Sequence, residues 1–132
     1  MNIVYTKEAP EAIGPYSQAI KINGLVFTSG QIPINPASGK IEETNIEGQT
    51  EQVMKNLGAI LSHAGSGFEK AIKTVCFLAN MDDFGKFNEI YGKYFTSKPA
   101  RSCVAVKTLP KNVLVEVECI ALTKVKYSES SF

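Results

Sequence analysis

The sequence predicts an α+β fold in which helices cover one face of a β-sheet, and three observations support this. The candidate elements follow the order strand, strand, strand, helix, strand, helix, strand, strand, which is typical of such folds. Asn23-Gly24, between two apolar runs, is a strong hairpin signal. The last strand candidate, residues 113–123, is largely apolar on both faces. With 132 residues, 44% hydrophobic and 20% charged, the chain is expected to form one domain spanning residues 1–132.

The first third of the chain contains three strand candidates and two loops. Residues 3–6 predict a short strand, and residues 16–22 and 25–29 predict the two strands of the hairpin. Prolines and glycines predict loops at residues 8–15 and 32–39, because proline cannot donate a ladder hydrogen bond. The sheet is therefore expected to begin as a meander.

The first helix is predicted from its start signal and its spacing. Thr44 and Glu47 match a capping box, in which the first residue caps the helix. Apolar residues then recur at helical spacing: Val53, Leu57, Ile60, Leu61 and Ala64. Gly65 is expected to end this helix.

The second helix is predicted at residues 84–95. Asp82 or Asp83 is the expected N-cap. Aromatic residues recur at three- and four-residue steps and are expected to face the core: Phe84, Phe87, Tyr91 and Tyr94.

Two further strands flank this second helix. Residues 72–79 form an apolar run rich in β-branched side chains, which predicts a strand buried on both faces. Pro99 is expected to keep Lys98 extended, and the chain then continues as a strand from Arg101 to Val106.

The strand at residues 113–123 follows a turn at residues 109–112, so we expect it to pair near the Arg101 strand. Its odd-numbered residues face one side and its even-numbered residues face the other. Two helices can cover only one face of this sheet. A second copy of the chain is the simplest cover for the other face.

Charge and composition limit the kinds of binding partner and the cellular compartment that we expect for this chain. The formal net charge of +1 gives no electrostatic reason to expect nucleic acid or an anionic membrane. The N-terminus does not resemble a secretory signal and no apolar run approaches a membrane span, so we expect a cytoplasmic protein. The three cysteines, Cys76, Cys103 and Cys119, lack the spacing of a zinc site or a disulfide framework. The tail after about residue 126 is expected to be loose.

Neither a cofactor nor a metal is expected. The chain has no glycine-rich nucleotide motif. His63 is its only histidine, which removes sites that need a pair of them. His63 is expected at a helix end, where a basic side chain interacts with terminal carbonyl groups.

Arg101 is the most informative candidate, because it is the only arginine beside thirteen lysines. A guanidinium binds a carboxylate or phosphate through two parallel hydrogen bonds. The alternative is an ordinary surface ion pair. On a strand, Arg101 shares a face with Cys103 and Ala105. Cys103 could be a nucleophile, but no histidine is near it in sequence, so we expect it to contribute shape and backbone groups.

Glu116 is the most informative carboxylate, because it lies in the strand expected beside the Arg101 strand. It could polarise a water next to a bound substrate, or it could merely neutralise Arg101 or a lysine. Glu118 lies on the same predicted face and competes for either role. Four weaker candidates lie at strand ends or in the second helix: Tyr16, Ser29, Gly30 and Asn88.

Taken together, these residues resemble the RidA/YjgF/UK114 family of reactive-intermediate deaminases. The matching stretches are residues 12–19, 27–33, 52–57, 81–84, 88–91, 99–104, 109–111 and 115–118. They occur in order along nearly the whole chain, and Pro99-Ala100-Arg101-Ser102-Cys103 is the most specific of them.

The resemblance implies a chorismate-mutase-like protomer in a homotrimer, with the site between neighbouring subunits. It also implies hydrolysis of 2-imino or enamino acids, such as 2-iminobutanoate and 2-iminopropanoate, to 2-keto acids and ammonia, without cofactor or metal. By analogy Arg101 clamps the substrate carboxylate, Glu116 orients the attacking water and Tyr16 assists proton movement. Cys103, Ser29, Gly30 and Asn88 line the pocket.

Two other functions remain alternatives. One is an endoribonuclease or translation inhibitor, although the near-neutral charge and the single histidine argue against RNA cleavage. The other is a non-catalytic trimer that binds small carboxylates or acts like a chaperone.

Overall fold

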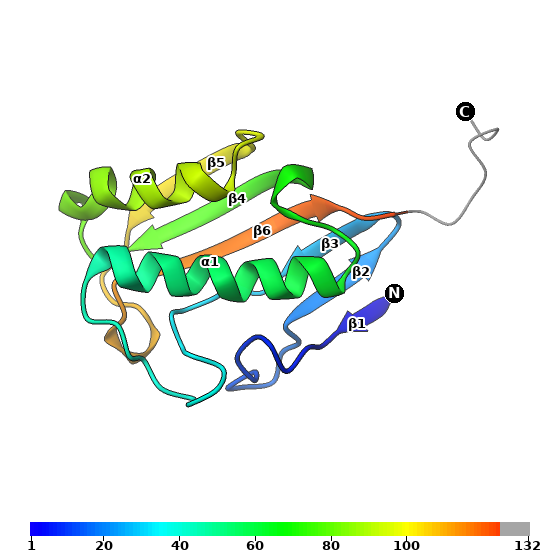
Figure 1. The fold of residues 1–132 in the computed structure, drawn as a ribbon, viewed down its shortest axis with the longest axis horizontal. Helices are drawn as coiled ribbons and strands as arrows, with labels where there is room; N and C mark the ends of the chain where they lie inside the picture. Colours follow the sequence, from blue (N-terminus) through cyan, green and yellow to red (C-terminus); the bar gives the residue numbers. More distant parts are fainter. Residues whose placement is uncertain (125–132) are drawn as a thin grey trace.

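The computed structural model describes residues 1–124 and consists of two helices packed on a mixed six-stranded sheet (Figure 1). The elements are β1 (Asn2–Val4), β2 (Ala19–Ile22), β3 (Leu25–Thr28), α1 (Ile46–His63), β4 (Ala71–Leu78), α2 (Phe84–Tyr94), β5 (Ala100–Ala105) and β6 (Val115–Leu122), with 3₁₀ turns at Phe68–Lys70, Met81–Asp83 and Pro110–Asn112. The α+β class and the order of the elements are as predicted. The expected loose tail lies outside the described residues.

The strands run in the order β1–β2–β3–β6–β4–β5 across the sheet. Neighbours are antiparallel except β4 and β5, which are parallel. Strand β4 therefore separates the Arg101 strand from the Glu116 strand. The prediction that these two strands are neighbours is wrong, because β5 returns from α2 to the outer edge of β4.

The predicted hairpin is confirmed, but its first strand begins at Ala19 rather than at Tyr16, so Tyr16 lies in the preceding loop. Asn23 and Gly24 both have positive φ, 50° and 78°, as the tight turn between two twisted strands requires. Strands β2 and β3 pair from Ala19 with Thr28 to Ile22 with Leu25.

Helix α1 begins one residue later than predicted. Its N-cap is Asn45, whose side chain accepts a hydrogen bond from Gly48 N at 2.7 Å. Both asparagine and threonine are favoured N-cap residues, so the sequence pattern did not decide between Thr44 and Asn45 as the cap. The predicted end is confirmed, because Gly65 has φ 80° and the amide of Ser66 bonds back to the Leu61 carbonyl.

Helix α2 packs its aromatic side chains inward, as predicted. Phe87 and Tyr91 are buried, and Phe84 and Tyr94 pack against the core. Asp83 occupies the N-cap position, as predicted, but its side chain makes no capping hydrogen bond. The chain instead enters through a 3₁₀ turn.

That 3₁₀ turn is capped by Asn80, whose side chain accepts a bond from Asp82 N. At the far end of α2, Lys98 is not extended, because it has φ 54° in a turn that bonds Lys98 N to the Phe95 carbonyl.

The core lies between the helices and one face of the sheet. The helix-facing residues of β6 are fully buried against α1: Val115, Val117, Cys119 and Ala121. Helix α1 contributes Val53, Met54 and Leu57 to the same cluster. Burying these apolar side chains contributes about 25 cal/mol per Å² of apolar surface removed from water.

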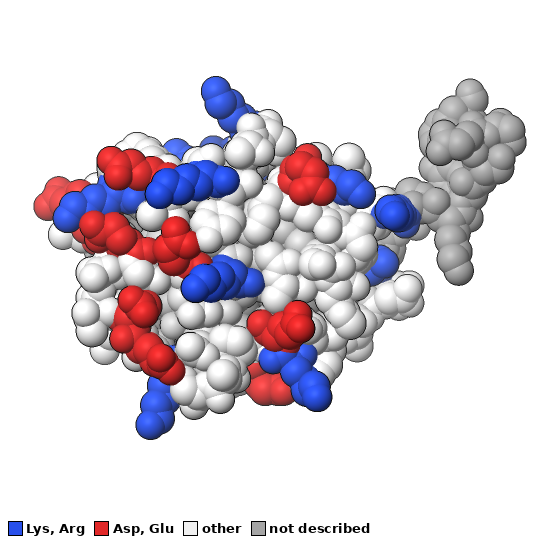
Figure 2. All heavy atoms as spheres, in the orientation of Figure 1, with Lys and Arg blue, Asp and Glu red and all other residues white. Residues whose placement is uncertain are grey.

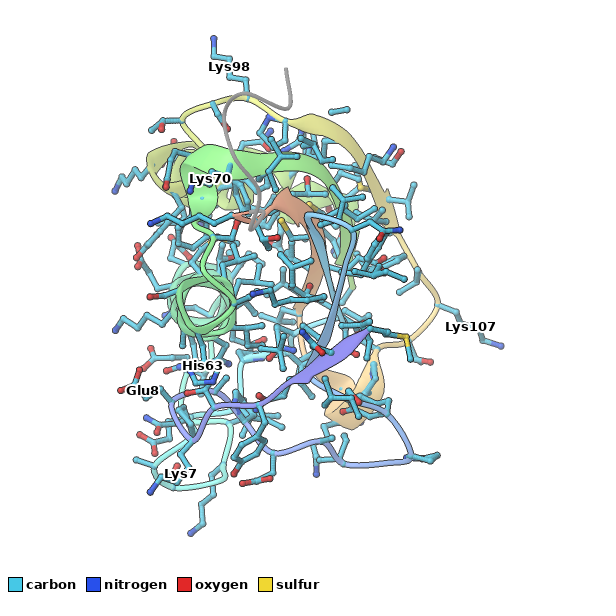
Figure 3. The ribbon with its side chains drawn as sticks, turned by 90° about the vertical axis from the view of Figure 1, so that its right-hand side faces the viewer. Lys7, Glu8, His63, Lys70, Lys98 and Lys107 are labelled. Atoms are coloured by element: carbon cyan, nitrogen blue, oxygen red, sulfur yellow. The ribbon has the colours of Figure 1, made fainter. Side chains whose placement is uncertain are left out.

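Neither helix within residues 1–124 covers the other face of the sheet. Figure 3 views the molecule from the side, with α1 on one side of the sheet and Lys107 projecting from the other. Large apolar side chains remain exposed there, namely Ile3, Phe27, Val104 and Leu122. Strand β4 alternates buried residues with half-buried or exposed ones. The predicted burial of β4 on both faces is therefore wrong for a single chain.

The helix-covered face carries charges of both signs, interspersed rather than gathered into one patch (Figure 2). No helix within residues 1–124 is long and apolar enough to cross a membrane.

Candidate functional site

Arg101 lies on the helix-facing side of the edge strand β5, where α2 holds it. Its Cα is registered with Thr74, a fully buried residue of β4. The guanidinium carbon lies 4.8 Å from the centroid of the Tyr91 ring and 5.4 Å from that of Phe84. Its Nη1 donates to Oδ1 of Asn88 at 2.7 Å. Two rings and an amide therefore set the position of the charge.

The Tyr91 ring is itself fixed. Its hydroxyl oxygen lies 2.7 Å from Oγ1 of Thr74, within hydrogen-bonding distance. Burial raises the pKa of Tyr91, so the phenol is neutral at physiological pH. The ring therefore supports Arg101 without bringing a charge of its own.

Arg101 has no carboxylate partner within residues 1–124. The salt bridge in that part of the chain joins Lys86 to Glu47 at 3.9 Å, on the surface. Of the five N–H donors of the guanidinium, only one bonds to another described side chain. The surface ion pair considered for Arg101 is therefore wrong for the described residues. A half-buried cation with unused donors is suited to an anionic ligand.

The open edge of β5 adds backbone donors. Val106 N donates to the Leu78 carbonyl at 2.9 Å, so Val106 points toward β4. Alternate residues of a strand point their backbone groups the same way. The N–H groups of Arg101 and Cys103 therefore point away from β4, toward the open edge. Cys103 can thus offer a backbone donor near the guanidinium.

A cavity of about 500 Å³ lies beside Arg101, and we call it the Arg101 pocket. Its lining includes Asn88, Tyr91, Phe95, Lys98 and Arg101. Lys98 is exposed, and its side chain projects outward from the molecule (Figure 3).

A second cavity, of about 320 Å³, collects most of the other predicted residues, and we call it the Glu116 pocket. It is lined by Ile13, Tyr16, Ser29, Gly30, Ile32, Pro110 and Glu116. The sequence predicted the four polar or glycine positions but not the apolar wall. The signal for that wall was present, because each of its three members lies in a segment rich in proline or glycine.

The Glu116 carboxylate packs directly against Gly30. A Cβ added at Gly30 would collide with the carboxyl group of Glu116. The absence of a side chain at Gly30 is therefore what admits the acid. Burial, together with the neighbouring charge of Glu118, raises the pKa of Glu116 above its ordinary value. Glu116 forms no salt bridge within residues 1–124, so it neutralises neither Arg101 nor a lysine there.

Tyr16 and Ser29 differ in whether the hydroxyl proton is free to donate a hydrogen bond to a ligand. The Tyr16 oxygen accepts a bond from Ile13 N at 3.2 Å, which leaves its own proton available to a ligand. Ser29 Oγ donates to the Ser17 carbonyl, so the Ser29 proton is already used.

The two pockets lie on opposite sides of the sheet. Arg101 is registered with Thr74 of β4, whereas Glu116 is registered with Phe77. Residues three apart on a strand point to opposite faces. One chain therefore brings Arg101, Asn88 and Cys103 together, but it does not bring them to Glu116.

The remaining candidates lie elsewhere. His63 ends α1 and lines a separate cavity with residues 5–8, beside Lys7 and Glu8 (Figure 3). The three cysteines are free. Burial raises the pKa of Cys76 and Cys119 to about 12 and also raises the pKa of Cys103. Within residues 1–124, no group of three His, Cys, Asp or Glu residues could hold a metal ion.

Comparisons with known proteins are consistent across the chain. A family model described as Endoribonuclease L-PSP matches residues 6–123. A Lactococcus lactis protein named putative regulator AldR is 57% identical, covering 94% of this chain and 99% of its own. A mouse protein named 2-iminobutanoate/2-iminopropanoate deaminase is 44% identical, covering 92% of this chain and 90% of its own. A Thermotoga maritima structure described as a putative endoribonuclease has a TM-score of 0.91 at 45% identity, covering 95% of this chain and 99% of its own.

Proposed function

Because the chain belongs to the Endoribonuclease L-PSP family, which is the YjgF/RidA family, we propose that it hydrolyses reactive 2-imino and enamino acids to 2-keto acids and ammonia. Its substrates would include 2-iminobutanoate and 2-iminopropanoate, the acids in the name of the mouse relative. The observation that carries the proposal is Arg101, a half-buried cation held by α2 with no carboxylate partner within residues 1–124. A small organic acid supplies that partner.

The complete site in this proposal lies between copies of the chain, in a homotrimer. The Arg101 pocket and the Glu116 pocket are on opposite faces, so a second copy must join them. The exposed apolar side chains on the helix-free face favour such an assembly, because they remain in contact with water in a single chain.

In the proposed reaction, Arg101 and the Cys103 N–H hold the substrate carboxylate. Water attacks the carbon of the protonated imine while Glu116 accepts a proton from that water, which forms a neutral carbinolamine. Glu116 then returns this proton to the amino nitrogen. The carbon–nitrogen bond breaks, the carbinolamine hydroxyl becomes the keto group, and its proton leaves with the nitrogen as an ammonium ion. A raised pKa suits Glu116 to this exchange, since an acid–base group works best with a pKa near the ambient pH.

The other side chains of the Glu116 pocket have supporting roles. Tyr16 can donate a hydrogen bond to the substrate, because its oxygen already accepts one from Ile13 N. Ile13, Ile32 and Pro110 form an apolar wall that fits a substrate side chain.

The test is the lifetime of freshly generated 2-iminobutanoate, measured by trapping the remaining imine with semicarbazide. The wild-type protein should shorten this lifetime, and Arg101→Ala should lose at least about 100-fold of the effect. Circular dichroism and the Tm should confirm that the variant is folded. Equal rates with wild type and variant would reject the role of Arg101, and no acceleration by the wild type would reject the proposed activity.

A further inference from the structure

Gln18 has more hydrogen bonds to the backbone than any pocket residue, yet it lines neither the Arg101 pocket nor the Glu116 pocket. Its side chain is 3% exposed. The amide oxygen accepts from Thr6 N at 2.8 Å. The amide nitrogen donates to the carbonyl oxygens of Thr6, Ala9 and Pro10 at 3.0, 3.3 and 2.9 Å. Since an amide nitrogen carries two hydrogens, these three acceptors share them.

The segment that Gln18 holds has little regular structure of its own. Residues 5–18 connect β1 to β2 without a helix or a strand. Buried backbone groups need partners, and Gln18 supplies them for the first half of this segment. The second half carries Ile13 and Tyr16 into the Glu116 pocket.

The backbone of the same residue also reaches Ser29. The Gln18 carbonyl accepts from Ser29 N at 2.8 Å, and the carbonyl of Ser17 accepts from Ser29 Oγ. A small cavity that shares Tyr16 and Gly30 with the Glu116 pocket is also lined by Gln18. Gln18 therefore bonds to Ser29 and lines the same small cavity as Tyr16 and Gly30, so it lies next to three residues of the Glu116 pocket.

We propose that Gln18 is a positioning residue for the Glu116 pocket, fixing residues 6–16 so that Tyr16 and Ile13 stand opposite Glu116. This inference rests on the proposed function for its catalytic readout. Its geometric readout, the order of residues 6–16, does not depend on that function.

Two variants separate the parts of the contact. Gln18→Leu keeps the volume and removes every side-chain hydrogen bond. Gln18→Glu keeps the acceptor for Thr6 N but turns an oxygen toward the carbonyls of Ala9 and Pro10, where only a protonated acid can donate.

Gln49→Leu is the matched control. Gln49 is also buried, accepting from Leu114 N at 2.8 Å and donating to the Glu43 carbonyl at 3.0 Å. It lines neither the Arg101 pocket nor the Glu116 pocket. If the Gln18 side chain only stabilises the fold, its substitution should change kcat/KM no more than Gln49→Leu does.

The experiment measures amide hydrogen exchange of residues 6–16, the Tm and the imine hydrolysis rate for all four proteins. We expect both Gln18 variants to speed exchange in residues 6–16 and to lower kcat/KM about tenfold or more, whereas Gln49→Leu stays within about twofold of wild type. The activity of Gln18→Glu relative to wild type should rise as the pH is lowered from about 8 to about 6, and that of Gln18→Leu should not.

Unchanged exchange in residues 6–16, or a loss of kcat/KM no larger than that of Gln49→Leu at equal Tm, would overturn the proposal. If the wild type hydrolyses no imine, the proposed function fails, and hydrogen exchange alone then decides whether Gln18 orders residues 6–16.

Discussion

The Arg101 pocket and the Glu116 pocket are built in different ways. Arg101 projects from a strand and is held by side chains of one helix, so regular elements set its geometry. Glu116 also projects from a strand, but the other walls of its pocket come from loops and strand ends. The position of Arg101 is thus fixed by secondary structure, whereas the Glu116 pocket depends on buried hydrogen bonds that order loops.

In the proposed function, this difference separates two tasks. Binding a carboxylate needs one rigid cation, which a helix and a strand supply. Guiding water and protons onto a reacting carbon needs several groups placed around it. The following predictions test whether the Arg101 pocket and the Glu116 pocket act separately and whether different copies of the chain supply them. They also test how strongly activity responds to small changes in each pocket.

The largest effect should come from placing the Arg101 and Glu116 substitutions in different copies of the chain. Arg101→Ala and Glu116→Gln should each lower kcat/KM for 2-iminobutanoate at least about 100-fold. Unfolded and refolded together in equal amounts, they should recover about one quarter of wild-type activity, since one shared site in four then receives both wild-type residues. Each variant refolded alone is the control. Absence of recovery would mean that both residues act within one chain.

A methyl group at Gly30 should disturb the Glu116 half alone. Gly30→Ala places a Cβ against the Glu116 carboxylate and should lower kcat by about 10- to 100-fold, because the acid must move. The matched control is Gly85→Ala in α2, where a Cβ meets open space. That variant should keep full activity and gain about 0.5–1 kcal/mol in the free energy of unfolding. Steady-state rates and chemical unfolding measure both, and normal activity of Gly30→Ala would argue against a role for Glu116.

A smaller effect is expected where α2 supports the cation. Asn88→Ala removes the hydrogen bond to Nη1 of Arg101 and should raise KM about tenfold with a lesser change in kcat. Lys86→Ala, on the same helix, removes only the surface pair with Glu47 and should change neither constant. A loss in kcat alone would place Asn88 in the chemical step instead.

The smallest effect concerns pH. Burial and the charge of Glu118 raise the pKa of Glu116, and protonated Glu116 cannot accept a proton from water. The rate should therefore fall as the pH drops through that raised pKa. Glu118→Gln removes the neighbouring charge, lowers the pKa of Glu116 and should move this acid limb to lower pH. A limb that moves upward or stays in place would mean that Glu116 does not set it.

Local signals in the sequence predicted most of the fold. The positive φ values of Asn23 and Gly24, the inward aromatic side chains of α2 and the alternating burial of β6 all follow from residues close together in the chain. The choice between Thr44 and Asn45 as cap did not follow, because both residue types satisfy the same donors.

The pairing of strands was harder to predict, because it joins distant segments. Arg101 and Glu116 were each identified from their residue type, but their places on opposite faces depend on β4 lying between them. Gln18 was missed, although it lies in one of the matching stretches, because nothing in its neighbours shows that its amide is buried. The proposed role of Gln18 follows only from its hydrogen bonds to residues 6–10 in the structure.

The cysteine side chains have a chemical consequence if the proposed function, hydrolysis of electrophilic carbon–nitrogen double bonds, is correct. Thiolates, not thiols, attack such carbons. Because burial raises the pKa of Cys76 and Cys119 to about 12, both side chains remain thiols at neutral pH. The buried sulfur atoms of Cys76 and Cys119 are therefore poor nucleophiles toward an imine bound in either pocket.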